Sequence, residues 1–142
     1  MHLIPALVGN LIVPPAVVDE LNVGRSLGLD LPDLTNLGWV RVQPPISTKA
    51  LPLVWDLGKG ETEVLMLALE ISGSKIILDD LLARRVAQFL QIPLTGTLGI
   101  LLDAKQSGLI EEIQPLLVRL QQLRFKLSKQ TYEAVLKLAN ER

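Results

Sequence analysis

The sequence predicts an α/β fold with a parallel sheet and a helical C-terminus. Short apolar runs bounded by Pro, Gly or Asp alternate with longer segments of helical periodicity, a pattern typical of parallel strands joined by helices. Hydrophobic residues make up 49% of the chain but aromatic residues only 4%, so the core must consist mainly of Leu, Ile, Val and Ala. The mean hydropathy of +0.36 favours a buried parallel sheet or a partner interface.

Length and composition restrict the class of protein. A chain of 142 residues suits a single domain, which we expect to span residues 1–142. The net charge of −1 argues against a protein that binds nucleic acid through phosphate neutralisation alone. The chain has no cysteine, which excludes disulfides, zinc thiolates and thiol catalysis. We also expect a cytoplasmic protein with no membrane partner, since there is no signal peptide and no apolar run of roughly 18–20 residues.

The N-terminal part is expected to contain two strands and one helix. Residues 1–10 offer too little length for a well-formed element, and the first strand is predicted at 11–13. A Pro-Pro pair ends this strand and begins a helix over 16–22 that ends near Gly24, because proline suits a first helical turn. Residues 24–38 are expected to form a loop with one helical turn. Alternating apolar and polar residues then favour a strand over 39–43.

The central part repeats the alternation of helix and strand. After a loop over 46–57, a helix is predicted from Glu61 to about Ile71, apolar on nearly every side and therefore central. A strand at 75–78 and a helix from Asp79 or Asp80 to about Leu90 follow. The strand predicted at 92–95 contains a proline, which indicates a position at the edge or end of a sheet.

Three helices are predicted to close the chain, over 97–108, 110–123 and 128–139. Ser128 is the expected N-cap of the last helix. The leucines of the middle helix could face the core or a second subunit, and the core is the favoured alternative. These leucines are Leu116, Leu117, Leu120 and Leu123.

Acidic residues follow the predicted strands and begin the predicted helices. Asp79 and Asp80 come directly after a strand, Glu61 and Glu63 open the central helix, and Glu20 lies in the helix after the first strand. Because the carboxyl ends of parallel strands meet at one edge of a sheet, these carboxylates could share a pocket. Clustered carboxylates repel one another unless a cation neutralises them, and Mg²⁺ or Mn²⁺ does so with oxygen ligands. Such a site can activate water for attack on a phosphate.

The alternative is that these acids only begin helices. Asp and Glu are favoured at helix N-termini by capping and by the helix dipole. One cap needs one acid, so the Asp79-Asp80 pair leaves both interpretations open. Glu63 fits the capping interpretation less well, because a carboxylate in the wall of an apolar helix needs a partner.

Other candidate motifs are weaker. His2 is the only histidine and lies at the chain end. The glycines at 58–60 and 96–99 lack the rest of a phosphate-binding loop, and each is expected to be a turn before a helix. Arg84 and Arg85 suit a solvated helix face, although they could touch an RNA backbone.

Five segments in this order resemble the PIN-domain superfamily of ribonucleases, and most closely a prokaryotic branch related to VapC-type toxins. They cover nearly the whole chain. The segments are VPPAVVDEL (13–21), WVRVQPP (39–45), LGKGETEVLMLALE (57–70), KIILDDLLARRVAQFLQIPLTGTLGILLDAKQSGLI (75–110) and RFKLSKQTYEAVLKLA (124–139).

The resemblance implies a Rossmann-like three-layer α/β/α sandwich and hydrolysis of RNA phosphodiester bonds with Mg²⁺ or Mn²⁺. Glu20 matches the second acid of the family, Glu63 the third, and the Asp79-Asp80 pair the fourth, while Glu61 is typical of this branch. We expect one aspartate of the pair to cap a helix and the other to ligate metal.

The chain departs from the family at its beginning. Members begin with a central strand that carries the first acid, the principal metal ligand, whereas no such strand precedes Leu11. Either the start codon was assigned too late or the gene is truncated. We therefore expect this PIN-like domain, with its first strand missing, to bind Mg²⁺ poorly and to cleave little or no RNA.

Two functions follow as expectations. The first is a toxin-antitoxin endoribonuclease with RNA as substrate, Lys59, Arg84 and Arg85 as RNA contacts, and a small antitoxin protein as partner. The second is a PIN-like binding module without catalysis, stabilised as a homodimer through its C-terminal helices.

Overall fold

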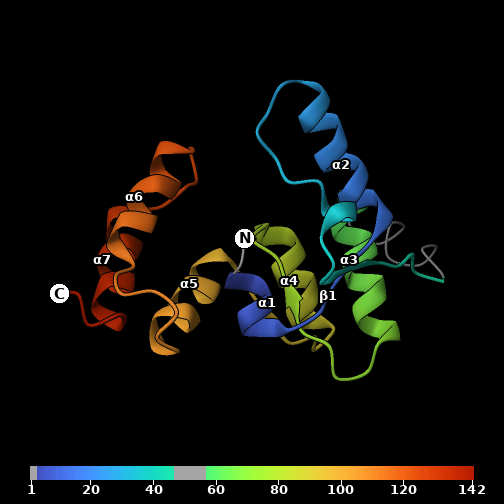
Figure 1. Cartoon of the computed structure of the whole chain (residues 1–142). Helices are drawn as coiled ribbons and strands as arrows, with labels where there is room; N and C mark the ends of the chain where they lie inside the picture. The colour runs from blue at the N-terminus through green and yellow to red at the C-terminus, as the bar shows by residue number, and fades with distance from the viewer. Residues whose placement is uncertain (1–2, 47–56) are drawn as a thin grey trace.

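A computed structural model describes residues 3–46 and 57–142, and confirms an α/β fold in which helices predominate (Figure 1). The strands are β1 (Leu11–Val13), β2 (Val40–Val42), β3 (Ile76–Ile77) and β4 (Leu94–Thr95). The helices are α1 (Leu3–Val8), α2 (Pro15–Ser26), α3 (Lys59–Glu70), α4 (Leu81–Phe89), α5 (Thr97–Gln106), α6 (Gln114–Gln122) and α7 (Lys129–Leu138), with a short 3-10 helix, η1 (Leu34–Asn36).

Helices α1 and α2 both differ from the sequence expectation. The first residues do form a helix, α1, which ends at Gly9 with a positive φ of 73°. Helix α2 continues past Gly24, where it was expected to end, and stops before Gly28, whose φ is +89°. Gly24 stays helical because it is buried against Leu31, whose side chain fills the space that a Cβ would need.

All four expected strands form, but they pair as two separate two-stranded parallel sheets. In the first, β1 pairs with β2 in the register Leu11 to Val40. In the second, β3 pairs with β4 in the register Ile76 to Leu94. The expected single parallel sheet is therefore divided between β1 and β3 in the described part of the chain.

Three hydrophobic clusters hold these elements. The largest joins α3, β3 and α4, with Leu65, Ala83 and Ala87 fully buried. A smaller one packs Val13 and Val18 against Leu34. The apolar face of α3 thus lies at the centre, as its sequence predicted.

The C-terminal helices form the third cluster, on the left of Figure 1. Leu117 is completely buried there, and Leu116 and Leu120 pack beside it, which confirms the core interpretation for these leucines. Leu123 instead remains 63% exposed at the end of α6. No helix in the described ranges is long and apolar enough to cross a membrane.

Candidate functional site

Helices α2 and α3 bring together two of the predicted acids, Glu20 and Glu63. The carboxylate of Glu20 lies over Gly60, where an added Cβ would come within 2.7 Å of Glu20 Oε1. One turn further along α3, Glu63 is only 7% exposed, and its Oε1 accepts a hydrogen bond of 3.1 Å from the backbone N–H of Ala16. Since Ala16 and Glu20 are also one turn apart, the two carboxylates occupy successive turns of the same helix contact.

The contact with Ala16 gives Glu63 a structural role that its sequence position did not reveal. The residue at the N-cap of α2 is Pro14, which makes no side-chain cap hydrogen bond. Glu63 supplies the missing acceptor from a different helix, so a carboxylate meets the positive end of the α2 dipole. The start of α2 therefore provides the hydrogen-bond partner that the buried carboxylate of Glu63 requires.

Glu61 begins α3 beside this contact. Its carboxylate folds back over Gly58, the N-cap, where a Cβ would come within 2.5 Å of Glu61 Oε2. Both Glu20 and Glu61 line one cavity of about 820 Å³, whereas Glu63 does not. The glycines at 58 and 60 therefore leave room for carboxylates, in addition to starting a helix.

Asp79 and Asp80 follow β3, and both accept hydrogen bonds at helix starts. Asp80 is the N-cap of α4 and accepts from the N–H of Ala83 at 2.9 Å. Asp79 reaches the start of α5 instead, where it accepts from the N–H and the hydroxyl of Thr97 at 2.9 and 2.6 Å. The expected cap is therefore Asp80, and Asp79 joins the end of β3 to the start of the next helix. Ligation of metal by either aspartate stays a prediction.

The three basic residues expected near RNA differ in their surroundings. Arg84 is half-buried, and its Nη1 donates to the carbonyl of Leu78 at 2.8 Å, so it stabilises the end of β3. Lys59 and Arg85 are exposed. Lys59 lines a second cavity of about 410 Å³ together with Asp19 and Glu20.

The acids do not converge on one point. Within residues 3–46 and 57–142, no group of three or more His, Asp or Glu residues could hold a metal ion. Mg²⁺ prefers near-octahedral oxygen coordination with several waters and one or two carboxylates, usually shared with substrate phosphates. As arranged, Glu20, Glu63 and the aspartate pair do not amount to a complete metal site, and His2 falls outside the described residues.

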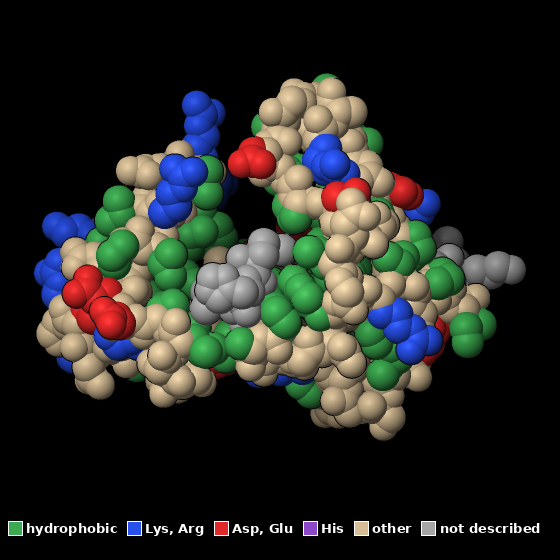
Figure 2. All heavy atoms as spheres, in the orientation of Figure 1, with side chains coloured by type: hydrophobic (Ala, Val, Ile, Leu, Met, Phe, Trp, Pro, Cys, Tyr) green, Lys and Arg blue, Asp and Glu red, His purple; other side chains and the backbone are tan. Residues whose placement is uncertain are grey.

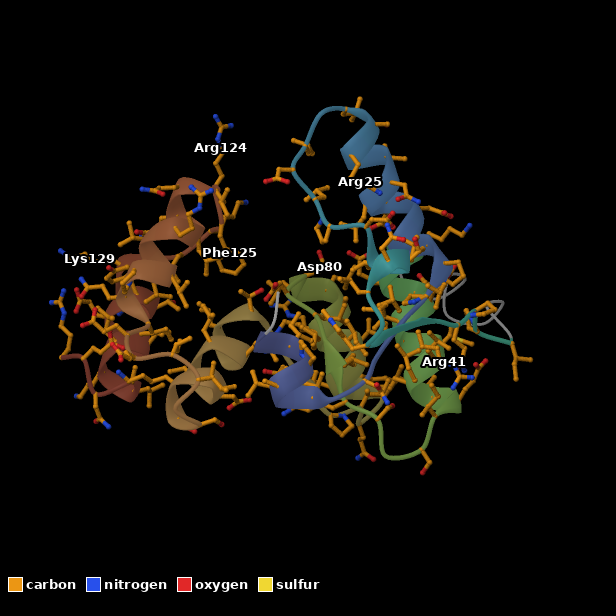
Figure 3. All side chains as sticks on the ribbon, in the orientation of Figure 1. Arg25, Arg41, Asp80, Arg124, Phe125 and Lys129 are labelled. Atoms are coloured by element: carbon orange, nitrogen blue, oxygen red, sulfur yellow. The ribbon has the colours of Figure 1, made fainter. Side chains whose placement is uncertain are left out.

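Two side chains that sequence reasoning missed lie at the turn after α6. The surface shown in Figure 2 is hollowed between the C-terminal helices and the part formed by α2. In the same view, Arg124 rises from the C-terminal side of this hollow and Phe125 points toward it (Figure 3). Asp80 lies at the N-terminal end of α4. The only signal of these two residues in the sequence is the adjacency of a cation and an aromatic ring at positions 124 and 125.

Comparison with known proteins agrees with the fold. The sequence model of a protein family described as PIN domain matches residues 1–141. No curated protein and no solved structure shows significant similarity to the chain.

Proposed function

Because the chain belongs to the PIN-domain family, a nuclease-type fold, we propose that it provides part of a metal-dependent ribonuclease site that hydrolyses RNA phosphodiester bonds. The observation that supports this most is the pairing of Glu20 and Glu63 on successive turns of the α2–α3 contact. Both are positions at which the family resemblance expects metal ligands. Gly60, which has no side chain, leaves room for the Glu20 carboxylate.

The proposed cofactor is Mg²⁺ or Mn²⁺, with Glu20 and Glu63 as the first candidate ligands and Glu61, Asp79 and Asp80 as further ones. Because the described residues contain no group of three acids placed to hold a metal, the 142-residue chain should bind the cation weakly. Its RNA cleavage should accordingly be slow. Arg124, Lys59 and Arg85 are the exposed cations proposed to contact the RNA backbone.

The biological setting proposed for this activity is a toxin-antitoxin pair in the cytoplasm. A small antitoxin protein would then cover the acidic edge near Glu20 and Glu61. Support comes from the resemblance to VapC-type toxins.

A second candidate function is a binding module without catalysis, and a specific observation favours it. Glu63, Asp79 and Asp80 each accept a hydrogen bond from the backbone at a helix start. These three carboxylates therefore already have a structural role at the starts of helices. In this alternative RNA or a protein binds, and no bond is broken.

RNA cleavage with a titration of Mg²⁺ and Mn²⁺ separates the two functions. We expect slow cleavage of a labelled single-stranded RNA by the purified chain, abolished by EDTA and by Glu20→Gln or Glu63→Gln. Glu112→Gln, at an exposed position in the C-terminal part, is the matched control and should leave the rate unchanged. Cleavage no faster than in protein-free samples, together with metal-independent RNA binding, would establish the binding module instead.

A further inference from the structure

The turn between α6 and α7 collects basic residues without acidic ones. Residues 114–130 contain Arg119, Arg124, Lys126 and Lys129 but no Asp or Glu, so all 15 acidic residues of the chain lie elsewhere. All four cations are exposed, and Figure 2 shows basic side chains projecting from this end of the C-terminal helices. A chain with a net charge of −1 therefore concentrates positive charge at one turn.

None of these four cations forms an ion pair with another residue of the described ranges. The one acid of α7 is Glu133, a turn away from Lys129, and it pairs with Arg142 at 3.1 Å instead. Arg119 contacts an amide, the Oε1 of Gln122 at 3.5 Å. The positive charges of the turn therefore remain available to an external anion.

Arg124 occupies a backbone conformation that favours glycine. Its φ is +67°, just after the end of α6, and its N–H donates to the carbonyl of Gln121 at 3.0 Å. At the corresponding position after α2 and α5 the chain has Gly28 and Gly108, while Gln91 is the uncharged counterpart after α4. A side chain is strained in this left-handed region. The stability of the turn therefore does not explain the arginine.

Lys129 is also unfavourably placed for stability. It is the first residue of α7, whose cap is the neutral Ser128 and whose first turn contains no acid. A cation at the positive end of a helix dipole lowers the stability of the helix. Helices α2, α4, α5 and α6 instead have a carboxylate at that end. Two of the four cations thus reduce local stability, and such conflicts are expected at functional positions.

The same turn presents apolar side chains on either side of Arg124. Leu123 is 63% exposed, and Phe125 is half-buried. In Figure 3 Phe125 points toward the hollow beside the C-terminal helices, Arg124 rises next to it, and Lys129 lies on the other side of the helical pair. The positive surface therefore extends over the end of this pair, with an aromatic ring beside it. Bases of a single strand stack on such a ring while cations contact the phosphates.

We propose that the basic turn, formed by Arg119, residues 123–126 and Lys129, binds single-stranded RNA without metal. The choice of RNA rests on the proposed function, but the turn is separate from the acidic residues of the α2–α3 contact, so binding and cleavage use different parts of the chain. The exposed amides of Gln121 and Gln122 add hydrogen bonds to phosphate or sugar. The aromatic ring favours a nucleic acid over an acidic protein segment, because carboxylates need only the cations.

Fluorescence anisotropy of a labelled oligouridine of about 12 nucleotides, measured with the whole chain in EDTA, tests the proposal. The variant Arg124→Gln, Lys126→Gln and Lys129→Gln together should bind the strand at least about tenfold more weakly at low salt. The slope of log K against log salt concentration should become shallower by about 0.7 for each cation removed, or about two in all. No binding by the wild-type chain in EDTA would overturn the proposal.

A matched variant removes the same charge from other places. Arg41→Gln, Lys75→Gln and Lys137→Gln together change three exposed cations outside the turn. Distant exposed charges are screened by salt, so this variant should keep the RNA affinity within about twofold of wild type. An equal loss of affinity in both triple variants would assign the effect to net charge, which contradicts a localised binding surface.

Single substitutions separate RNA binding from stability. Glycine suits the φ of +67°, so Arg124→Gly should leave Tm unchanged or higher while the affinity for RNA falls. Gln91→Gly makes the same backbone change at a φ of +59° and should leave the affinity unchanged. Phe125→Leu stays apolar but loses the stacking ring, and should bind about fivefold more weakly. Wild-type affinity of Phe125→Leu, together with displacement of RNA by polyglutamate, would identify an acidic protein segment as the occupant instead.

Binding at the turn and cleavage can fail separately. RNA that binds through the turn in EDTA but is never cleaved with Mg²⁺ or Mn²⁺ would support this proposal and contradict the ribonuclease. Cleavage by a chain whose variant at residues 124, 126 and 129 binds and cleaves RNA like wild type would overturn this proposal and leave the ribonuclease in place.

Discussion

Glu63 is both a structural residue of the α2–α3 contact and a candidate metal ligand. Its carboxylate accepts from the N–H of Ala16 and lies one helical turn from the place where Glu20 covers Gly60. A carboxylate that is only 7% exposed must be hydrogen-bonded to be tolerated, so its position is fixed by the start of α2. Substitutions can separate this structural role from metal binding, because an amide retains the acceptor oxygen but loses the charge.

The first prediction compares two replacements of Glu63. Glu63→Gln should leave the free energy of unfolding within about 1 kcal/mol of wild type, since the amide oxygen can still accept from Ala16. Glu63→Ala should lower it by about 1–3 kcal/mol, because α2 loses its acceptor and a buried N–H is left unpaired. Urea unfolding measures both, with Glu112→Ala as a control. Equal losses for Gln and Ala would show that the charge, rather than the acceptor, stabilises α2.

The second prediction concerns Gly60. In Gly60→Ala the new Cβ would come within 2.7 Å of Glu20 Oε1, so the flexible Glu20 side chain must move. Alanine favours a helix over glycine by up to about 1 kcal/mol, and stability should therefore be unchanged or higher. Metal-dependent RNA cleavage should fall, because the Glu20 carboxylate is displaced.

Gly38→Ala is the control for this substitution, since nothing lies within 4 Å of the added Cβ. Thermal unfolding and the cleavage assay are measured on the same preparations. If Gly60→Ala cleaves RNA at the wild-type rate with unchanged metal dependence, the Glu20 carboxylate is not placed by Gly60 for catalysis.

At the scale of elements, two helices obtain their N-terminal acceptors from distant glutamates. Helix α2 is capped by Glu63, as described above, and α6 by Glu141, which accepts from the N–H groups of Ile113 and Gln114 at 2.7 and 3.1 Å. Lys105 also forms an ion pair with Glu141 at 3.3 Å. By contrast, Ser128 caps α7 locally through Thr131, as the sequence predicted.

The third prediction follows from the charge of Glu141. Burial raises the pKa of this carboxyl, but hydrogen bonds from Ile113 and Gln114 and the nearby Lys105 outweigh it and hold the pKa below its ordinary value of 4.5. A depressed pKa stabilises the fold above the unfolded-state value, and this stability is lost as the pH falls through the folded-state value. Glu141→Gln should therefore be less stable at pH 7, by about 1 kcal/mol.

Urea unfolding between pH 7 and pH 3 measures this effect. The difference between wild type and Glu141→Gln should shrink as the pH falls from 4.5 through the lower folded-state pKa of Glu141, because the carboxyl is then protonated and neutral like the amide. Glu112→Gln, at an exposed position, should show no such convergence. A difference that does not change with pH would assign the role of Glu141 to packing.

At the scale of the whole molecule, the hydrophobic interior is divided. The cluster of α5, α6 and α7 has no buried residue in common with the cluster around α3 and α4, or with the one around Val13 and Val18. The cavity of about 820 Å³ lies between β1 and β3, so the two small sheets gain no backbone pairing from each other. Such a molecule should open in parts, each with its own stability.

The fourth prediction tests this division by amide exchange. Leu117→Ala removes a fully buried side chain and should cost the C-terminal helices about 2–5 kcal/mol. Exchange should accelerate in α6 and α7 and change little in α3 and α4. Leu123→Ala, at a position that is 63% exposed, is the control. Equal acceleration throughout the chain would indicate one cooperative unit.

The sequence by itself determined most of the elements and the local caps. Strands at Leu11–Val13 and Ile76–Ile77, the apolar α3, the cap at Ser128 and a cap within the Asp79-Asp80 pair depend on periodicity and on neighbours within a few residues, which a sequence displays. The structure decided that Asp80 is the cap of that pair. Two expectations were wrong: residues 3–8 form α1, where no element was expected, and α2 continues past Gly24. The glycine at 24 was taken as a helix end, although burial against Leu31 keeps it helical.

Only the tertiary structure decided which distant groups meet. The sequence could place Glu63 and Glu141 on helices, but not show that they cap α2 and α6 from 47 and 28 residues away. It also could not show that the four correctly predicted strands pair as two separate sheets, with residues of both β1 and β3 lining one cavity. Pairing between strands and contacts between helices depend on how the whole chain packs, and neither leaves a local pattern in the sequence.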